Sequence, residues 1–293
     1  MDRTRLRAYI KICITVIVWG ISFIAIKIAL RDLSPVSVVW LRFGMGVAVL
    51  AFVALARQQL NLPSHRDLAY FALLGFLGIT FHQLLQSTAL LTTQASTASW
   101  IVATIPVFMA LLGWLFLKEK LGWLKTSGIA LAAMGVLLVV TNGNLGSLVR
   151  GNFGTVGDIL VLISALNWAI FSVLSRPGTQ RFPVTQMTLF VMGFGWLFIS
   201  IQFIAIRGWT EIPNVTINGW LAIAFLGILC SGLGYVFWYD GLQAIPASQV
   251  GVFLNFEPLV TLIVAAAMLG EGIYISSLLG GGLILAGVWM VNR

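Results

Sequence analysis

The segment Phe76-Leu77-Gly78-Ile79 recurs as Phe225-Leu226-Gly227-Ile228, at an offset of 149 residues in a chain of 293. Further matched positions follow in the same order along both parts of the chain. They pair Trp19 with Trp168 at the same offset and, at an offset of 152, Ala95-Ser96 with Ala247-Ser248, Pro106 with Pro258, Glu119 with Glu271, Gly128 with Gly280, and Gly135 with Gly287. An ordered series of matches indicates an internal repeat. The sequence therefore predicts two copies of one unit, over residues 1–145 and 146–293.

Composition predicts the environment of these two copies. Hydrophobic residues make up 59% of the chain and charged residues 9%, whereas about 25% of the residues in a typical soluble domain are charged. So few charged side chains cannot cover the surface of a soluble protein of this size. The composition excludes an ordinary cytosolic enzyme, a secreted disulfide scaffold and a disordered protein, and it predicts a polytopic membrane protein.

Ten apolar runs are long enough to cross a bilayer, which takes about 20 helical residues. They cover residues 9–29, 36–56, 68–90, 95–117, 122–141, 157–176, 184–206, 219–241, 248–269 and 274–292. Each copy thus holds five spans, and because five is odd, the copies must insert in opposite orientations. We expect an all-α membrane protein with ten transmembrane helices, arranged as two inverted five-helix repeats around a central cavity. This plan is common among secondary transporters.

Lys and Arg residues predict the orientation, because cytoplasmic loops are enriched in them. With a cytoplasmic N-terminus, 12 of the 17 lie inside and five outside, namely Lys27, Arg31, Arg42, Arg150 and Arg207. We therefore expect both termini in the cytoplasm. The net charge of +8 then reflects topology, and because the basic residues form no clustered face, we expect the lipid bilayer as a partner and no nucleic acid.

Several short motifs resemble those of one known family. They are Trp19-Gly20-Ile21-Ser22-Phe23, Ser34-Pro35, Trp40-Leu41-Arg42-Phe43, Pro106 before Leu117-Lys118-Glu119-Lys120-Leu121, and the second-copy counterparts Glu257-Pro258 and Leu269-Gly270-Glu271. In their order and duplication the chain resembles the EamA family of the drug/metabolite transporter superfamily, in particular its ten-helix bacterial exporters of aromatic and other neutral amino acids. The resemblance implies a gradient-driven carrier of small molecules in the bacterial inner membrane, with protons as a candidate coupling ion and no cofactor. It leaves the substrate open, because the family carries many solutes.

Polar side chains in the middle of a span are costly and usually face a cavity or another helix. Several of them here lie three or four residues from an aromatic side chain, which places both on one helix face. The candidate substrate-binding residues are Trp19, His82, Gln86, Trp100, Trp168, Tyr235 and Trp238. Aromatic rings and polar groups together suit a small zwitterion, because rings cover its apolar part and accept its ammonium group. The alternative is helix packing or an interfacial belt of tryptophans.

Glu257 is the acidic residue placed deepest in a span. An isolated carboxylate there tends to be neutral, so it could carry a proton or bind a substrate ammonium group. In the alternative interpretation it hydrogen-bonds backbone groups that Pro258 leaves free. Pro106 and Pro258 are paired kink candidates. Glu119 and Glu271 lie at the ends of spans, which favours a gating or packing role for them.

Three classes of function compete. The leading one is a secondary active transporter that exports aromatic or neutral amino acids by alternating access; the export or import of other metabolites or drugs is the nearest alternative. An enzyme is disfavoured, because the chain has two histidines and no metalloprotease, nucleophile-elbow or nucleotide-binding motif. Its two cysteines have no metal-ligand spacing, so no metal site is expected. A channel is disfavoured because no filter segment is present. The oligomeric state is left open.

Overall fold

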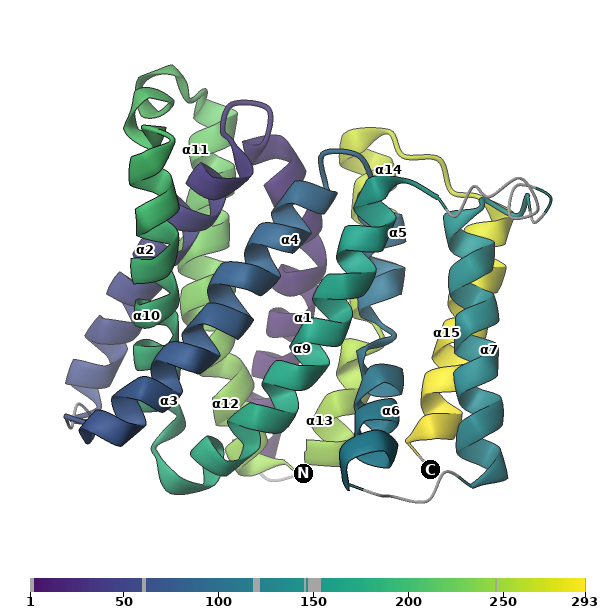
Figure 1. Cartoon of the computed structure of the whole chain (residues 1–293), viewed down its shortest axis with the longest axis horizontal. Coiled ribbons are helices and arrows are strands. Elements are labelled where there is room, and N and C mark those ends of the chain that lie inside the picture. The colour runs from purple at the N-terminus through teal and green to yellow at the C-terminus, as the bar shows by residue number, and fades with distance from the viewer. Residues whose placement is uncertain are drawn as a thin grey trace.

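The computed structural model describes residues 3–59, 62–117, 122–144, 146, 154–245 and 247–292. In these residues the chain is helical and contains no strand. The elements are α1 (Arg3–Ala29), α2 (Pro35–Ala56), α3 (His65–Gly75), η1 (Phe76–Phe81), α4 (His82–Ala89), α5 (Ala95–Val102), α6 (Ile105–Leu117), α7 (Trp123–Val140), α9 (Val156–Arg181), α10 (Val184–Ala205), η2 (Gly208–Thr210), η3 (Ile212–Asn214), α11 (Ile217–Ala224), η4 (Phe225–Leu233), α12 (Gly234–Ala244), α13 (Ala247–Leu254), α14 (Glu257–Leu269) and α15 (Ile275–Val291). Figure 1 shows both termini at one end of the bundle.

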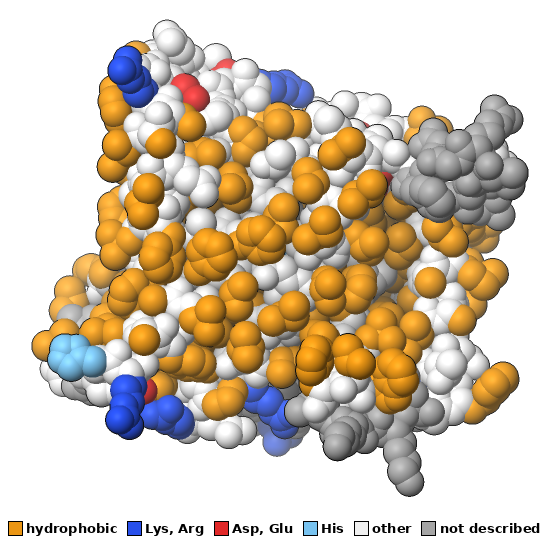
Figure 2. All heavy atoms as spheres, in the orientation of Figure 1, with side chains coloured by type: hydrophobic (Ala, Val, Ile, Leu, Met, Phe, Trp, Pro, Cys, Tyr) orange, Lys and Arg blue, Asp and Glu red, His pale blue; other side chains and the backbone are white. Residues whose placement is uncertain are grey.

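The helices have the length and composition of membrane spans. Within the described part of the chain, nine helical stretches of at least 18 residues are apolar enough to cross a bilayer. α15 is apolar but has 17 residues, which gives a length of about 26 Å against a hydrocarbon core of about 30 Å. Figure 2 shows hydrophobic side chains over the middle of one face, with Lys and Arg side chains at its two ends. The protein is a multi-pass membrane protein, and its ten-span inverted insertion stays a prediction.

Two spans are interrupted at Pro106 and Pro258, where the sequence predicts kinks. α5 ends at Val102 and α6 begins at Ile105, with Pro106 in its first turn. α13 ends at Leu254 and α14 begins at Glu257, with Pro258 in its first turn. Proline lacks the N–H that would continue the preceding helix, but it fits the first turn of a new one. Each predicted kink is therefore a full break in the helix.

The helices pack in matching pairs across the two halves of the chain. α1 contacts α11, η4 and α12, while α9 contacts α3, η1 and α4. α2 packs on η4, α10 packs on η1, and α2 and α10 pack on each other. α7 and α15 lie side by side at one edge of the bundle (Figure 1). The helices that begin each half thus lie against the third span of the other half.

Glycines allow α7 and α15 to approach closely. A Cβ atom on Gly128 would lie 2.7 Å from the carbonyl oxygen of Gly287, and one on Gly135 would lie 2.5 Å from that of Gly280. The reverse contacts measure 2.5 Å for Gly287 and 2.7 Å for Gly280. No side chain fits between backbones this close, so these four glycines have a structural role in the contact between α7 and α15.

We expect Gly280→Leu to destabilise the protein strongly, because its side chain would push α15 away from α7. The cost of such overpacking is about 3 kcal/mol. Gly282→Leu on the same helix is the matched control, because a Cβ there meets nothing within 4 Å. Thermal unfolding of both variants in detergent measures the difference, and equal melting temperatures would contradict the close contact.

Candidate functional site

Two of the predicted site residues meet although they are 86 positions apart. The rings of His82 on α4 and Trp168 on α9 have centroids 4.6 Å apart, and Trp168 lies 4.8 Å from Phe171 on its own helix. The Nδ1 atom of His82 lies 3.1 Å from the carbonyl oxygen of Ser164, one turn before Trp168. His82, Trp168 and Phe171 form what we name the α9 aromatic cluster.

Three other predicted residues meet between α1 and α12. The ring of Trp19 lies 5.5 Å from that of Tyr235 and 5.3 Å from that of Trp238. The Nε1–H of Trp19 donates a hydrogen bond of 3.2 Å to the carbonyl of Cys230. Trp19, Tyr235 and Trp238 form the α1 aromatic cluster, so the sequence pattern identified residues that the fold does bring together.

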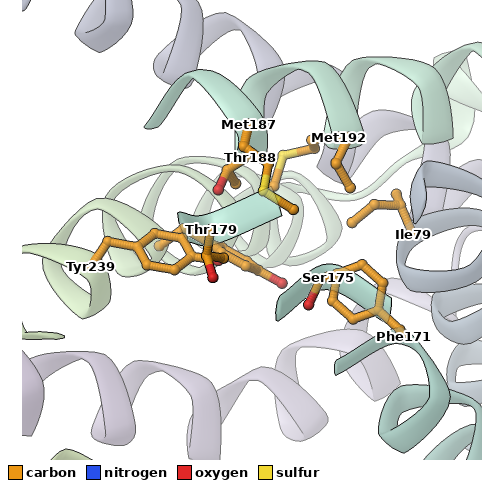
Figure 3. Close-up of a pocket in the computed structure, with 10 residues that line it drawn as sticks. Ile79, Phe171, Ser175, Thr179, Met187, Thr188, Met192 and Tyr239 are labelled. Atoms are coloured by element: carbon orange, nitrogen blue, oxygen red, sulfur yellow. The ribbon is translucent and has the colours of Figure 1, made fainter. Parts of the chain in front are cut away.

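A pocket lies between the two aromatic clusters. It has a volume of about 30 Å³ and is lined by Ile79, Phe171, Ser175, Thr179, Met187, Thr188, Val191, Met192, Tyr235 and Tyr239 (Figure 3). Phe171 belongs to the α9 aromatic cluster and Tyr235 to the α1 aromatic cluster. Thr179 is exposed whereas Met192 is buried, so the pocket runs inward from the end of α9. That end lies on the side of the two termini (Figure 1).

The volume of this pocket fits about two water molecules and no larger solute. A substrate of amino-acid size therefore requires α9, α10 and α12 to move apart. Among the predicted substrate residues, Tyr235 lines the pocket itself. The pocket residues that sequence reasoning missed, such as Met187 and Met192, are apolar and look like any other side chain of a membrane helix.

Two predicted residues lie elsewhere. Trp100 is 1% exposed and packs on α15, where a Cβ on Gly281 would come within 2.5 Å of its ring. In the described part of the chain its Nε1–H has no acceptor. Gln86 is buried on α4, one turn beyond His82. The structure does not place Trp100 or Gln86 at the pocket, and their substrate roles stay predictions.

Glu257 is the first residue of α14, directly after the break in its span. Its backbone carbonyl accepts a hydrogen bond of 3.0 Å from the Thr261 hydroxyl. Its half-buried carboxylate makes no hydrogen bond or ion pair with any residue that the structure describes. The carboxylate therefore does not satisfy backbone groups near Pro258, which was the alternative interpretation.

Arg42 corrects the sequence prediction. It was counted as an outer loop charge, but it lies within α2 and is 5% exposed. Its Nε donates to the Ser231 hydroxyl at 2.8 Å and its Nη1 donates to Oε1 of Gln83 at 3.1 Å. Basic residues indicate topology where they lie in loops, whereas Arg42 lies inside the apolar run 36–56. We name Arg42, Gln83 and Ser231 the Arg42 cluster.

The two repeat-matched segments of the sequence are both π-helices. η1 begins at Phe76 and η4 at Phe225, the first residues of the two matching segments. A π-helix carries one extra residue per turn and often occurs at functional sites. Side chains of the neighbouring helices bind its carbonyls: Trp19 donates to Cys230, and Asn167 donates to Leu77 at 2.8 Å. Both π-helices thus position the helices that carry the aromatic clusters.

Glu271 joins three segments at the end of the bundle away from the termini. Its carboxylate accepts hydrogen bonds from the backbone N–H of Ala95 at 2.7 Å, from the hydroxyl of Ser96 at 2.7 Å, and from Nζ of Lys27 at 3.3 Å. Burial alone would raise the pKa of the Glu271 carboxyl, but these hydrogen bonds and the Lys27 charge together hold that pKa below its ordinary value. These contacts agree with a gating or packing role for Glu271, which stays a prediction, and Glu119 lies outside the described residues. We name Glu271, Lys27, Ala95 and Ser96 the Glu271 clamp.

Comparison with known proteins places this arrangement in a family. The sequence profile of the EamA-like transporter family matches residues 6–141 and 155–293. An uncharacterized transporter of Archaeoglobus fulgidus is 28% identical over 98% of this chain and 97% of its own length. A probable terminal-alkyne amino-acid exporter of Streptantibioticus cattleyicolor is 27% identical over 96% of this chain and 91% of its own length. The uncharacterized transporter YyaM of Bacillus subtilis is 28% identical over 92% of this chain and 88% of its own length.

A solved crystal structure has the same fold, with a TM-score of 0.67 and 19% sequence identity, over 98% of this chain and 97% of the other. The family profile covers nearly the whole chain in two segments, and these relatives are named as transporters rather than enzymes. The chain therefore belongs to the EamA-like transporter family.

Proposed function

We propose that the protein is a secondary active transporter that exports small metabolites, above all aromatic and other neutral amino acids, by alternating access. The observation that carries this proposal is the pocket between the α9 and α1 aromatic clusters, whose rings come from both halves of the chain. Such rings cover an apolar side chain and attract an ammonium group. The relative named as a probable terminal-alkyne amino-acid exporter supports this substrate class. Other metabolites or drugs are the alternative cargo.

The proposal includes two inverted copies, over residues 1–145 and 146–293, with both termini on the cytoplasmic side of a bacterial inner membrane. The family profile matches each half once. α2 and α10 each have 22 residues and begin 149 positions apart. Gly128 contacts Gly287, the counterpart of Gly135, and Gly135 contacts Gly280, the counterpart of Gly128. A twofold relation between the copies requires this crossed pattern. These observations support the inverted repeat.

Alternating access predicts a second pocket at the counterpart positions of the first. At the offset of 149, Ser175, Val191 and Met192 correspond to Ile26, Arg42 and Phe43. Likewise, Tyr235 corresponds to Gln86, a predicted substrate residue. Eight of the ten counterparts are buried, with exposed fractions of 0–7%, whereas Leu30 is half-buried and Ile228 is 42% exposed; the buried ones are Ser22, Ile26, Val38, Val39, Arg42, Phe43, Gln86 and Leu90. We propose that the structure represents one state of a transport cycle, in which the pocket on the side of the termini is open and the opposite side is closed.

The Glu271 clamp lies on the closed side, and we expect it to stabilise this state. Replacing Glu271 with Gln should cost about 2 kcal/mol, because hydrogen bonds to a charged group become neutral ones. The folded-state pKa of Glu271 is lowered. The stabilisation is therefore fully present above the unfolded-state pKa of about 4.3 and is lost as the pH falls through the folded-state value.

Thermal unfolding in detergent at pH 7 and at successively lower pH tests the clamp. At acidic pH, the melting temperature of the wild-type protein should fall to that of Glu271→Gln. Lys27→Gln is the companion variant and should show a smaller loss, because it removes one partner and leaves the bonds from Ala95 and Ser96. A wild-type advantage that persists unchanged below pH 3 would contradict this account of the clamp.

Exchange measurements test the proposed function. The purified protein in liposomes loaded with unlabelled amino acid should accumulate labelled phenylalanine, tryptophan or leucine by counterflow, with saturation at high concentration. Empty liposomes provide the background, and electrical recording separates slow saturable exchange from the large currents of a pore. The absence of saturable exchange across a broad panel of neutral amino acids would overturn the proposed substrate class.

A further inference from the structure

The Arg42 cluster is a polar site that the two aromatic clusters do not include. Arg42, Gln83 and Ser231 come from α2, α4 and η4 and are exposed by 5%, 5% and 0%. The two hydrogen bonds of the guanidinium group go to neutral oxygens. No carboxylate of the described residues lies within ion-pair distance of it. The guanidinium carbon also lies 5.0 Å from the centre of the Phe43 ring, so the positive charge has neutral partners and no negative one among the described residues.

Such a charge is expensive in a membrane and usually faces the interior or a solute path. Neutral partners compensate it only in part, because an unpaired buried charge costs more than a paired one. Charged residues that do form ion pairs lie at the ends of the bundle. Asp240, for example, pairs with Lys11 and Arg57. An apolar side chain at position 42 would serve helix packing equally well, so packing alone does not explain why a charged residue occupies this position.

The guanidinium group of Arg42 still has N–H groups that can donate hydrogen bonds to an anion. It has five N–H donors, and two of them are used by Ser231 and Gln83. Its Nη2 atom makes no hydrogen bond with the described residues, and it is not fully buried. A carboxylate with two oxygens can accept two parallel bonds from such a planar group.

The position of the Arg42 cluster relative to the pocket makes this capacity useful. Ser231 lies one helical turn before Tyr235, which lines the pocket. A Cβ on Gly46, one turn after Arg42, would lie 2.8 Å from Ser231 and 3.1 Å from Met192, which also lines the pocket. The Arg42 cluster therefore lies next to two residues that line the pocket, Tyr235 and Met192.

We infer that Arg42 binds the carboxylate of the transported solute, so that the substrate class is a small molecule with a free carboxylate and an apolar side chain. This inference rests on the proposed function and makes its substrate class narrower. The apolar part lies against the aromatic clusters, and the carboxylate replaces the missing counter-charge of the guanidinium group. A solute without a carboxylate leaves that charge unpaired and is rejected.

Ligand-induced thermal stabilisation of the full-length protein in detergent tests this inference, since a ligand that binds the folded state raises its stability. The probes are L-phenylalanine, 3-phenylpropionate, L-phenylalaninamide and phenethylamine. The first two have a carboxylate and should stabilise the wild-type protein, whereas the last two should need a concentration about 10- to 100-fold higher, as a charge-assisted hydrogen bond predicts. This comparison requires no variant, so misfolding cannot obscure it.

Variants assign the selectivity to Arg42. Arg42→Gln should reduce the preference for L-phenylalanine over L-phenylalaninamide to near onefold, and Arg42→Lys should keep part of it, because lysine has the charge but not the planar donors. Arg57→Gln is the matched control: it removes an arginine that pairs with Asp240 at the end of the bundle and should keep the preference. A merely structural Arg42 would lower the melting temperature without ligand and leave the preference unchanged.

The outcomes separate this inference from the proposed function. Equal stabilisation by L-phenylalanine and L-phenylalaninamide in the wild-type protein would overturn the role of Arg42 and leave the amino-acid transporter intact. An unchanged preference in Arg42→Gln would do the same. If none of the four probes stabilises the protein and no amino acid is exchanged in liposomes, the proposed substrate class and the carboxylate site are both overturned.

Discussion

Replacing Glu257 with glutamine should abolish accumulation of substrate driven by a proton gradient, while exchange of substrate without a gradient continues. The reason is the position of its carboxylate, which is half-buried at the break between α13 and α14 and has no hydrogen-bonding partner among the described residues. A carboxyl group in such a place can take up and release a proton during a cycle. Glutamine is similar in shape but cannot do this.

Proteoliposomes with an imposed pH difference measure the effect of this substitution on accumulation, and counterflow without the difference measures exchange. Glu257→Asp is the control variant, because it retains a carboxyl group and should retain part of the coupling. If Glu257 instead binds the ammonium group of the substrate, Glu257→Gln should lose exchange as well, at a cost of about 2–5 kcal/mol for the unpaired charge. Full accumulation in Glu257→Gln would contradict both roles.

Replacing Trp168 with alanine should weaken substrate binding at least about tenfold, which corresponds to about 1.4 kcal/mol for the loss of an aromatic contact. Trp168 lies between His82 and Phe171, and Phe171 lines the pocket, so removing Trp168 takes away the support of the pocket wall on the α9 side. The concentration of phenylalanine that gives half-maximal thermal stabilisation measures this loss.

Two variants control for packing at Trp168. Trp168→Phe keeps an aromatic ring and should have a small effect. Trp114→Ala removes a tryptophan that is 50% exposed on α6 and should leave binding unchanged. A Trp168→Ala protein that melts at a lower temperature but binds phenylalanine as tightly as the wild-type protein would assign Trp168 to helix packing.

The sequence predicted the spans well, because an apolar run of about 20 residues has few alternatives in a membrane protein. It also located both helix breaks, since a proline in a span disrupts the backbone bonds before it. It did not predict the π-helices of η1 and η4, because one extra residue in a turn leaves the hydrophobic pattern of a membrane helix unchanged. The repeat of Phe76 and Phe225 marked their positions without revealing their geometry.

The site was predictable only in part. The contact of His82 with Trp168 joins α4 to α9, and no local spacing determines which helices meet. Trp100 has polar residues at the same spacing as Trp168 but packs on Gly281. A polar face of a membrane helix can contact either another helix or a cavity, so the spacing does not reveal which face lines the pocket. Arg42 was misplaced because a rule about loop charges was applied to a residue inside a span.

Thiol labelling from the two sides of the membrane tests alternating access between inverted copies most directly. In a background with Cys13→Ser and Cys230→Ala, Ser175→Cys places a thiol in the pocket and Ile26→Cys places one at the packed counterpart position. We predict that a membrane-impermeant reagent reaches position 175 only from the side of the termini, and that position 26 becomes reactive only from the opposite side and only during substrate exchange. Reaction of both positions from the same side, or an Ile26→Cys thiol that stays unreactive throughout exchange, would contradict the account.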